Sequence, residues 1–285
     1  MVSLAVLLTV HNRKDCTEKA LCHLYKSCLP DDVSMDVYLT DDGCTDGTQD
    51  MIRLKYPSVV IIKGDGNLFW NRGMHLAWEK AASVKDYDYY LWLNDDTYIY
   101  DNAIKIILAN SHDKQDEAII VGATMSKKSG ECTYGLHDEI TGKLLIPNGT
   151  LQQGTNMNGN FVLIPKYVYS ILGNLDSYYH HGLGDTDYGL RAIENHIEVL
   201  LSKKFVGYCE RHSIQSVWCN PDYSVVQRWK ALNKPTGMPL RILYYHERNH
   251  YGFFTASFHF FTTVLHCIFP SCWNYCRKLY SKSEN

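Results

Sequence analysis

Short apolar runs alternate with helix-like stretches through the first half of the chain. We interpret five apolar runs as strands, at 4–10, 35–40, 59–63, 89–93 and 118–123. Between them the apolar spacing fits helices at 48–56, 71–82 and 102–110, after a first helix that starts at Asp15. Alternation of this kind predicts βαβ units and a mostly parallel sheet flanked by helices.

Start signals and further short runs extend this pattern. Asp15, followed three residues later by Glu18, predicts a capping box for the first helix. Beyond residue 150 we expect a strand at 161–164, a helix at 167–172 and two short strands at 199–201 and 205–208. Asp185 lies where a helix running to Asn195 would begin, so its carboxylate is expected to cap the free amides there.

Composition and charge narrow the class of protein. The chain has 285 residues, 45% hydrophobic and 21% charged, which is typical of a globular protein and excludes a disordered or collagen-like one. We expect a main domain at 1–215 and a C-terminal extension at 216–285. Residues 1–226 carry 20 Lys and Arg against 29 Asp and Glu, whereas 227–285 carry 8 against 2. The acidic main domain disfavours nucleic-acid binding, and the basic end suggests an anionic partner such as a membrane surface.

The cysteines and the first residues bear on the compartment. None of the ten cysteines lies in a C-x-x-C pair or at a zinc-ribbon spacing, so we expect reduced thiols in a cytoplasmic protein. The apolar run 4–10 has no basic segment before it and no small-residue cleavage site after it. This pattern predicts a buried strand rather than a signal peptide.

Polar side chains follow the predicted strands at the points where the strands end. The first strand is followed by His11, Asn12 and Arg13, the second by Asp41 to Gly47, and the fourth by Asn94, Asp95 and Asp96. In open parallel sheets, ligands bind beyond these carboxyl ends. Carboxylates from two strand ends on one edge repel each other unless a cation or a hydrogen-bond donor joins them. The clusters therefore suggest a site for a hard metal ion with oxygen ligands.

Five motifs in order carry a resemblance to a known family. They are Thr9 to Arg13, Asp41 to Thr48, Gly66 to Gly73, Leu93 to Asp96 as a variant of D-x-D, and Gly184 to Asp187 followed by Leu190 and Arg191. Over residues 3–250 the chain resembles the GT-A type nucleotide-sugar glycosyltransferases of family 2, especially rhamnosyltransferase-like enzymes of bacterial surface-polysaccharide biosynthesis. The resemblance implies an α/β fold of the Rossmann-like GT-A type, with a mostly parallel sheet and a C-terminal helical extension.

The resemblance also implies a donor site and a metal site. Asp41 and Asp42 would lie near the nucleobase of a UDP-, dTDP- or GDP-sugar, and Asp95 near the ribose. Asp96 would bind Mg²⁺ or Mn²⁺, which would bridge the two phosphates, with His212 completing the metal shell. The donor-binding residues that we predict are Thr9, Asn12, Arg13, Asp41, Asp42, Asn67, Trp70, Asn71 and Asp95. Two alternatives stay open, because a lone His is as often structural and Trp70 equally fits an aromatic core.

Asp185 matches the carboxylate that many relatives place in a Glu-Asp pair and use as general base. Gly184 stands where the Glu usually is, which puts roles assigned to that Glu in doubt but leaves Asp185 and Asp187 in register. The attacking hydroxyl must lose a proton, and a positioned carboxylate accepts it with gains of roughly 10² to 10⁴ in rate. The resemblance thus implies an inverting hexosyl- or rhamnosyltransferase that acts on a hydroxyl of a glycan or a lipid-linked oligosaccharide.

The C-terminal segment combines aromatic residues with basic flanks. Between Arg248 and Arg277 lie 28 residues without Lys, Arg, Asp or Glu. Polar residues and Pro270 interrupt this stretch, so an interfacial helix over 251–280, at the cytoplasmic face of a membrane, fits better than a membrane span. The alternative is a helix that packs on the main domain or in a homodimer contact.

Two rival functions remain open. A sugar-phosphate nucleotidyltransferase would share the sheet and the metal, but it is expected to carry a Gly-rich loop after the first strand, where this chain has His11 to Asp15 without glycine. A non-catalytic carbohydrate-binding protein would not need Asp95, Asp96 and Asp185 together. Dinucleotide oxidoreduction is excluded because no G-x-G-x-x-G follows the first strand.

Overall fold

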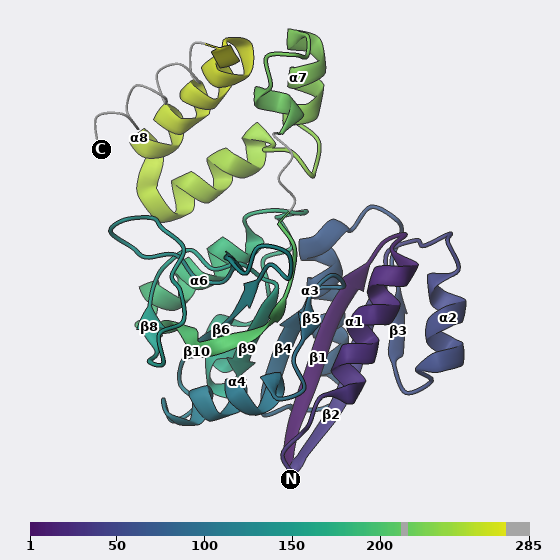
Figure 1. Cartoon of the computed structure of the whole chain (residues 1–285). Coiled ribbons are helices and arrows are strands. Elements are labelled where there is room, and N and C mark those ends of the chain that lie inside the picture. Colours follow the sequence, from purple (N-terminus) through teal and green to yellow (C-terminus); the bar gives the residue numbers. More distant parts are fainter. Residues whose placement is uncertain (212–215, 272–285) are drawn as a thin grey trace. The chain divides into compact units, whose positions relative to one another are not determined.

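The computed structural model describes residues 1–211 and 216–271 of the chain. The chain divides into two compact units, residues 1–211 and residues 212–285. The larger unit is an α/β domain built around one sheet (Figure 1). Its strands are β1 (Val2–Val10), β2 (Val33–Asp41), β3 (Val60–Lys63), β4 (Tyr89–Leu93), β5 (Tyr98–Ile99), β6 (Ile119–Met125), β7 (Cys132–Tyr134), β8 (Gln152–Gln153), β9 (Phe161–Pro165) and β10 (Val199–Tyr208). Its helices are α1 (Lys14–Lys26), α2 (Thr48–Lys55), α3 (Phe69–Val84), α4 (Ala103–His112), α5 (Lys166–Leu172) and α6 (Gly184–Glu194).

The sheet is mixed but mostly parallel, as predicted. Its strands run in the order β3-β2-β1-β4-β9-β6-β10-β5, with β7 paired to β6 and β8 paired to β10. β1 pairs in parallel with β2 and β4, β2 with β3, and β6 with β10. β9 lies antiparallel between β4 and β6. The loops that follow β1, β2 and β4 therefore leave the sheet at one edge, where ligands bind in such folds.

Both faces of the sheet are buried. On β1, Leu4, Val6 and Leu8 belong to one core and Leu7 belongs to the other. Side chains of α1, α2 and α4 complete the first core, and side chains of α3, α5 and α6 complete the second. A strand that is buried on both faces can be apolar at every position, which explains why β1 forms from an uninterrupted apolar run.

The start of α1 differs from the expectation. The helix begins at Lys14 without a side-chain cap, so the predicted box of Asp15 and Glu18 is wrong. Instead, Asp46 accepts hydrogen bonds from the backbone N–H of Lys14 at 2.9 Å and of Thr48, the first residue of α2, at 3.1 Å. One carboxylate from the loop after β2 thus satisfies free amides at two helix starts, which no local pattern in α1 reveals.

The expectation of two strands at 199–201 and 205–208 is also wrong, because both segments belong to the single strand β10. The register of β10 against β6 shifts between these segments. At the shift, Ser202 Oγ accepts a hydrogen bond from the backbone N–H of Ala123 at 3.0 Å and donates one to the carbonyl of Lys204 at 2.8 Å. The Ser202 hydroxyl thus takes the place of backbone hydrogen-bond partners at the shift, and β10 continues across residues 202–204 without a break.

The described part of the smaller unit is helical. It contains the short 3₁₀ helix η1 (Val217–Cys219) and the helices α7 (Val225–Leu232) and α8 (Leu240–Ile268). Ser224 and Gln227 form a capping box at the start of α7. α8 is kinked at Gly252, which has a φ of 84°. Among the helices of residues 1–211 and 216–271, none is long and apolar enough to cross a membrane.

Candidate functional site

Arg13 connects the loops that follow β1 and β4. Its Nη1 lies 3.0 Å from Asp95 Oδ1, and its Nη2 lies 2.9 Å from Asp96 Oδ2. One guanidinium therefore joins both carboxylates at the edge of the sheet. Burial works to lower the pKa of Arg13, but Asp95 and Asp96 outweigh it and raise that pKa. The arginine thus offsets the repulsion between the two carboxylates at every relevant pH.

Burial also sets the electrostatics of the two carboxylates. It raises the pKa of Asp95 to about 7, a rise that Arg13 opposes and Asp96 reinforces. Asp95 Oδ2 is buried and accepts no hydrogen bond from the described residues. Cys209 Sγ lies 3.7 Å from Asp96 Oδ1, and burial together with Asp96 raises the pKa of this thiol to about 12. The cluster contains two carboxylates but only one guanidinium, and one carboxylate oxygen, Asp95 Oδ2, has no hydrogen-bond donor among the described residues. This arrangement suits an additional cation.

Asp42 organises the loop between β3 and α3. Its carboxylate accepts hydrogen bonds from the backbone N–H of Gly66 at 2.8 Å, Leu68 at 3.0 Å and Phe69 at 2.9 Å. Asp42 directly follows β2 and is only 3% exposed. Because it accepts hydrogen bonds from backbone N–H groups at the start of α3, it acts as a remote cap for that helix. The Asp42 carboxylate already accepts hydrogen bonds from three backbone N–H groups, which argues against a direct contact between Asp42 and a nucleobase.

Asn12 and Asp41 shape the loop after β2. Asn12 has a left-handed φ of 50°, and its Oδ1 accepts a hydrogen bond from the backbone N–H of Thr45 at 2.7 Å. Asp41 Oδ1 accepts one from the backbone N–H of Cys44 at 2.8 Å. The loops after β1 and β2 are thereby joined, with Asn12 exposed and Asp41 buried.

Thr9 and Asn67 occupy different environments. Thr9 is half-buried against Gly73 of α3, where a Cβ would lie 2.0 Å from Thr9 Oγ1. Asn67 is exposed in the loop before α3, and its backbone N–H donates to Asp65 Oδ1 at 2.8 Å. Thr9 therefore contributes to the close packing of α3 on β1, while Asn67 presents its side chain to solvent.

Trp70 lies between the loop after β4 and Asp185. Its Nε1 donates to Asn94 Oδ1 at 2.6 Å. Gly159 packs on the indole, since a Cβ at Gly159 would lie 2.4 Å from the ring and 3.4 Å from Asp185 Cβ. The backbone N–H of Gly159 donates to Asp185 Oδ2 at 3.0 Å. Trp70, Gly159 and Asp185 are therefore contiguous with the loop that carries the acidic cluster.

The carboxylate of Asp185 is fixed in the first turn of α6. The helix begins at Gly184, after Leu183 with a left-handed φ of 71°, so Asp185 lies inside the first turn rather than at the N-cap, and its carboxylate serves a free amide of that turn, as predicted. Its Oδ1 accepts a hydrogen bond from the backbone N–H of Thr186 at 3.0 Å. Burial raises the pKa of Asp185, against the N–H groups of Gly159 and Thr186, which lower it. These donors orient the carboxylate and leave each oxygen a second lone pair for a proton.

The glycine before Asp185 has a steric cause. A Cβ at Gly184 would lie 1.8 Å from Asn71 Oδ1. Asn71 is fully buried, and its Nδ2 donates to the carbonyls of Asp176 at 2.7 Å and Tyr179 at 2.9 Å. The amide of Asn71 thus occupies the space that a larger residue at 184 would need, and it holds the loop that leads to α6. This burial argues against direct contact between Asn71 and a donor.

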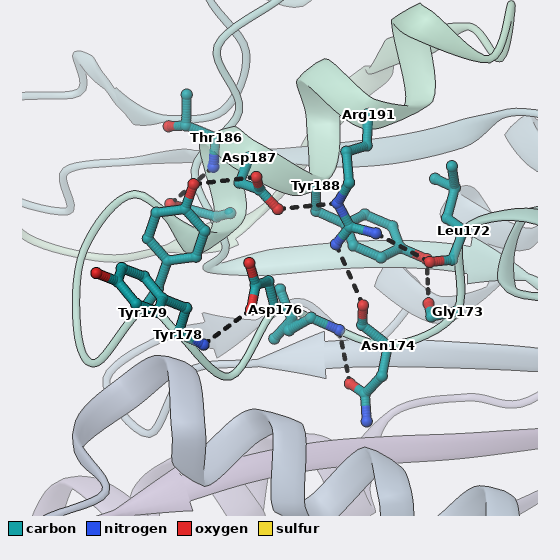
Figure 2. A network of polar contacts seen from close by, with 12 residues as sticks. Leu172, Gly173, Asn174, Asp176, Tyr178, Tyr179, Thr186, Asp187, Tyr188 and Arg191 are labelled. Atoms are coloured by element: carbon teal, nitrogen blue, oxygen red, sulfur yellow. Dashed lines mark hydrogen bonds and ion pairs between the residues drawn. The ribbon is translucent and has the colours of Figure 1, made fainter. Parts of the chain in front are cut away.

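Figure 2 shows a network of polar contacts that also holds this loop. Asp187 accepts hydrogen bonds from Arg191 Nε at 2.9 Å and from the Tyr179 hydroxyl at 3.1 Å. The Arg191 guanidinium donates further to the carbonyls of Leu172 at 2.9 Å and Asn174 at 3.2 Å. Asp187 therefore has a structural role in supporting the start of α6.

The family of this chain follows from its match to a family model. The model described as Glycosyl transferase family 2 matches residues 5–170, which include the loops after β1, β2 and β4. This chain belongs to glycosyl transferase family 2. The family that the five motifs suggested is thereby confirmed. No curated protein sequence matches this chain.

Solved structures show the fold of this family 2 chain. TarS 1–349 from S. aureus aligns with 94% of this chain and 72% of its own, with a TM-score of 0.57 and 12% identity. The mannosyltransferase PcManGT from Pyrobaculum calidifontis aligns with 93% of this chain and 72% of its own, with a TM-score of 0.56 and 12% identity. Against a longer TarS structure, the alignment covers 89% of this chain but only 44% of TarS. At this identity the likeness shows the fold alone, which is the GT-A fold that we predicted.

Several residues at the site were missed by sequence analysis. Cys209, which contacts Asp96, was not assigned to the site, and Asn94, which belongs to the predicted cluster at the end of β4, was given no role of its own. Gly159 had a usable signal, since a glycine two residues before a buried strand can mark a close approach of side chains to the backbone. His212 lies outside the described residues, so its metal role stays a prediction.

Proposed function

We propose that this family 2 chain transfers a sugar from a nucleoside diphosphate sugar to an acceptor hydroxyl with inversion, with Asp185 as general base and Mg²⁺ or Mn²⁺ at Asp96. The observation that carries the proposal is the position of Asp185, which is contiguous through Gly159 and Trp70 with the loop that holds Asp96. A single oriented carboxylate of raised pKa thus lies beside a separate acidic cluster.

The proposed reaction is a single displacement. The acceptor oxygen bonds to the anomeric carbon of the donor while the bond from that carbon to the diphosphate oxygen breaks, and its electron pair leaves with the nucleoside diphosphate. The hydroxyl proton passes to Asp185. Because the pKa of Asp185 is raised towards the operating pH, its carboxylate is a stronger base than an exposed aspartate. Attack and departure on opposite sides of the carbon give inversion.

The residues at the end of β4 fit a divalent cation. Asp95 and Asp96 supply the oxygen donors that Mg²⁺ and Mn²⁺ prefer, and Asp95 Oδ2 is buried without a hydrogen bond among the described residues. A divalent cation bound there would stabilise the negative charge on the departing diphosphate. Arg13 holds the two carboxylates together and adds a positive charge on the same edge. PcManGT and GalNAc-T7, both structurally similar to this chain, were solved with Mn²⁺, which supports this assignment.

The donor class is supported by relatives of the same fold. TarS 1–349 was solved with UDP and with UDP-GlcNAc, and PcManGT with GDP-Man. The proposed donor of this chain is therefore a UDP-, dTDP- or GDP-sugar. The proposed acceptor is a hydroxyl of a glycan or a lipid-linked oligosaccharide, taken up on the Asp185 side of Trp70.

A thermal-shift panel of UDP-, dTDP- and GDP-sugars, with and without Mn²⁺, tests the proposal. One nucleotide class is expected to raise the Tm only with Mn²⁺, because a ligand that binds only the folded state stabilises it. Asp96→Asn is expected to abolish this shift. The control Asp65→Asn, which alters an exposed carboxylate in the loop after β3, is expected to keep it. Equal shifts for the wild type and Asp96→Asn, or no shift with any donor, would contradict the proposal.

A further inference from the structure

The second half of α8 carries two apolar faces. The kink at Gly252 separates residues 253–268 from the first half of the helix. The two halves contact each other, since the rings of Tyr244 and Phe260 are 6.2 Å apart and Glu247 Oε2 lies 2.9 Å from His259 Nδ1. One face of the second half is thus used inside the smaller unit, where Cys267 is buried together with Leu232 of α7 and Leu240 of the first half of α8.

The other face is an exposed aromatic stripe. Phe254, Phe258, Phe261 and Leu265 are spaced by four, three and four residues, so they line one side of the helix. Their exposed fractions are 87%, 65%, 65% and 51%. Scattered exposed apolar residues are ordinary, but a continuous stripe of this kind marks a surface that meets another apolar phase. Phe269, 60% exposed, follows at the same spacing of four.

The charge of the smaller unit indicates what covers this stripe. The described residues 216–271 carry 5 Lys and Arg against 2 Asp and Glu, whereas residues 1–211 carry 20 against 28. The basic residues include Lys230, Lys234 and Arg248, which are exposed. A second copy of this unit would bring the same excess of positive charge to the contact. An anionic bilayer instead attracts each of these residues while it takes up the apolar side chains.

We infer that the stripe of Phe254, Phe258, Phe261 and Leu265 binds the surface of an anionic phospholipid bilayer, with the helix lying in the plane of the interface. Helices of this kind need an apolar face on one side and basic residues near it, and residues 253–268 contain no charged residue that would have to enter the lipid. The opposite face of the helix stays packed in its own unit. The sequence-based prediction covered 251–280, of which 272–280 lie outside the described residues, so the inference rests on the described part alone.

Flotation of the full chain with phospholipid vesicles tests the inference. We expect binding to vesicles that contain phosphatidylserine, weaker binding to vesicles of phosphatidylcholine alone, and weakening of the former by salt. The triple variant Phe254→Ser, Phe258→Ser, Phe261→Ser is expected to lose at least about 10-fold in partition coefficient, because each buried aromatic ring adds to interfacial binding. Equal partitioning of this variant and the wild type would overturn the inference.

Two further variants make the test independent of folding defects. The matched control Leu54→Ser, Ile140→Ser, Ile146→Ser removes exposed apolar side chains of the larger unit, and its binding is expected to be unchanged. The variant Lys230→Gln, Lys234→Gln, Arg248→Gln keeps the stripe, and it is expected to lose binding to anionic vesicles and the salt dependence.

Sedimentation velocity of the wild type and the stripe variant tests the remaining alternative, in which the stripe contacts a second copy of the chain. We expect both proteins to sediment with the same mass. A wild type that is dimeric, a stripe variant that is monomeric, and no vesicle binding by either would identify the stripe as a contact between copies and overturn the inference.

Discussion

Gly184→Ala is a sharp test of the packing beside Asp185. Helix propensity alone predicts that alanine in the first turn of α6 stabilises the protein by up to about 1 kcal/mol. The structure predicts the opposite, because the new Cβ would lie 1.8 Å from Asn71 Oδ1 and 2.5 Å from Asn71 Cγ. Either α6 or the buried amide of Asn71 has to move.

The cost can be worked from the contacts that Asn71 makes. Its Nδ2 donates to the carbonyls of Asp176 and Tyr179, and each such bond contributes roughly 1 kcal/mol net. Overpacking a well-filled interior costs typically about 1 to 3 kcal/mol. We therefore expect Gly184→Ala to lower the free energy of unfolding by roughly 3 to 5 kcal/mol.

A double-mutant cycle isolates this contact. In an Asn71→Ala background the nearest remaining Asn71 atom is Cβ, 3.3 Å from the new methyl group, so the cost of Gly184→Ala should fall below about 1 kcal/mol. Gly182→Ala is the control, since a Cβ at Gly182 meets nothing within 4 Å. Urea unfolding followed by the fluorescence of the buried Trp78 and Trp92 reports on the larger unit. A stable Gly184→Ala protein, or the same cost in both backgrounds, would refute the reasoning.

Three further predictions follow from the site. Removing the competing cation with Arg13→Gln should tighten Mn²⁺ binding to the donor-free protein by several-fold in calorimetry, and unchanged or weaker affinity would show that Arg13 does not compete there. Because burial raises the pKa of Asp185 and catalysis needs its anion, kcat/KM should fall as pH falls through a pKa above the ordinary aspartate value, and an acid limb at the ordinary value would contradict this. Trp70→Phe removes the donor to Asn94 and should cost roughly 1 kcal/mol in urea unfolding, whereas unchanged stability would show that the 2.6 Å bond contributes nothing net.

The central strands β1, β4, β6 and β9 could be predicted because each is an apolar run buried on both faces. Tyr89–Leu93 is a strand at the predicted bounds, and all five of its residues are buried between two helical layers. The edge at which the site lies follows from the same pattern, since parallel strands send their carboxyl ends to one side.

Helix starts were predicted less well because their partners come from elsewhere in the chain. Asp15 and Glu18 have the spacing of a capping box, yet Asp46 from the loop after β2 takes the first free amide of α1. Asp42 likewise serves α3 from the end of β2. Local spacing cannot reveal such remote caps, because they depend on tertiary structure.

The same limit applies to the site residues. Asp42 and Asn71 stand in motifs of the family, which suggested donor contacts, but the structure shows both side chains engaged with backbone groups of neighbouring loops. Gly184 departs from the motif for a reason that only the position of Asn71 makes visible. Sequence motifs therefore predict which loops form the candidate site, while the contacts that each of its residues makes are visible only in the packing.

The central claim is that Asp185 acts as general base in an inverting transfer, and the most direct measurement is the turnover of Asp185→Asn together with the anomeric configuration of the product by NMR. With an identified donor and acceptor, we expect Asp185→Asn to spare donor affinity and to lower kcat by about 10² or more. Asp187→Asn, which alters a carboxylate that supports the loop before α6, should lower stability but keep most of the turnover per folded molecule. Normal turnover of Asp185→Asn, or a product that retains the donor's anomeric configuration, would contradict the account.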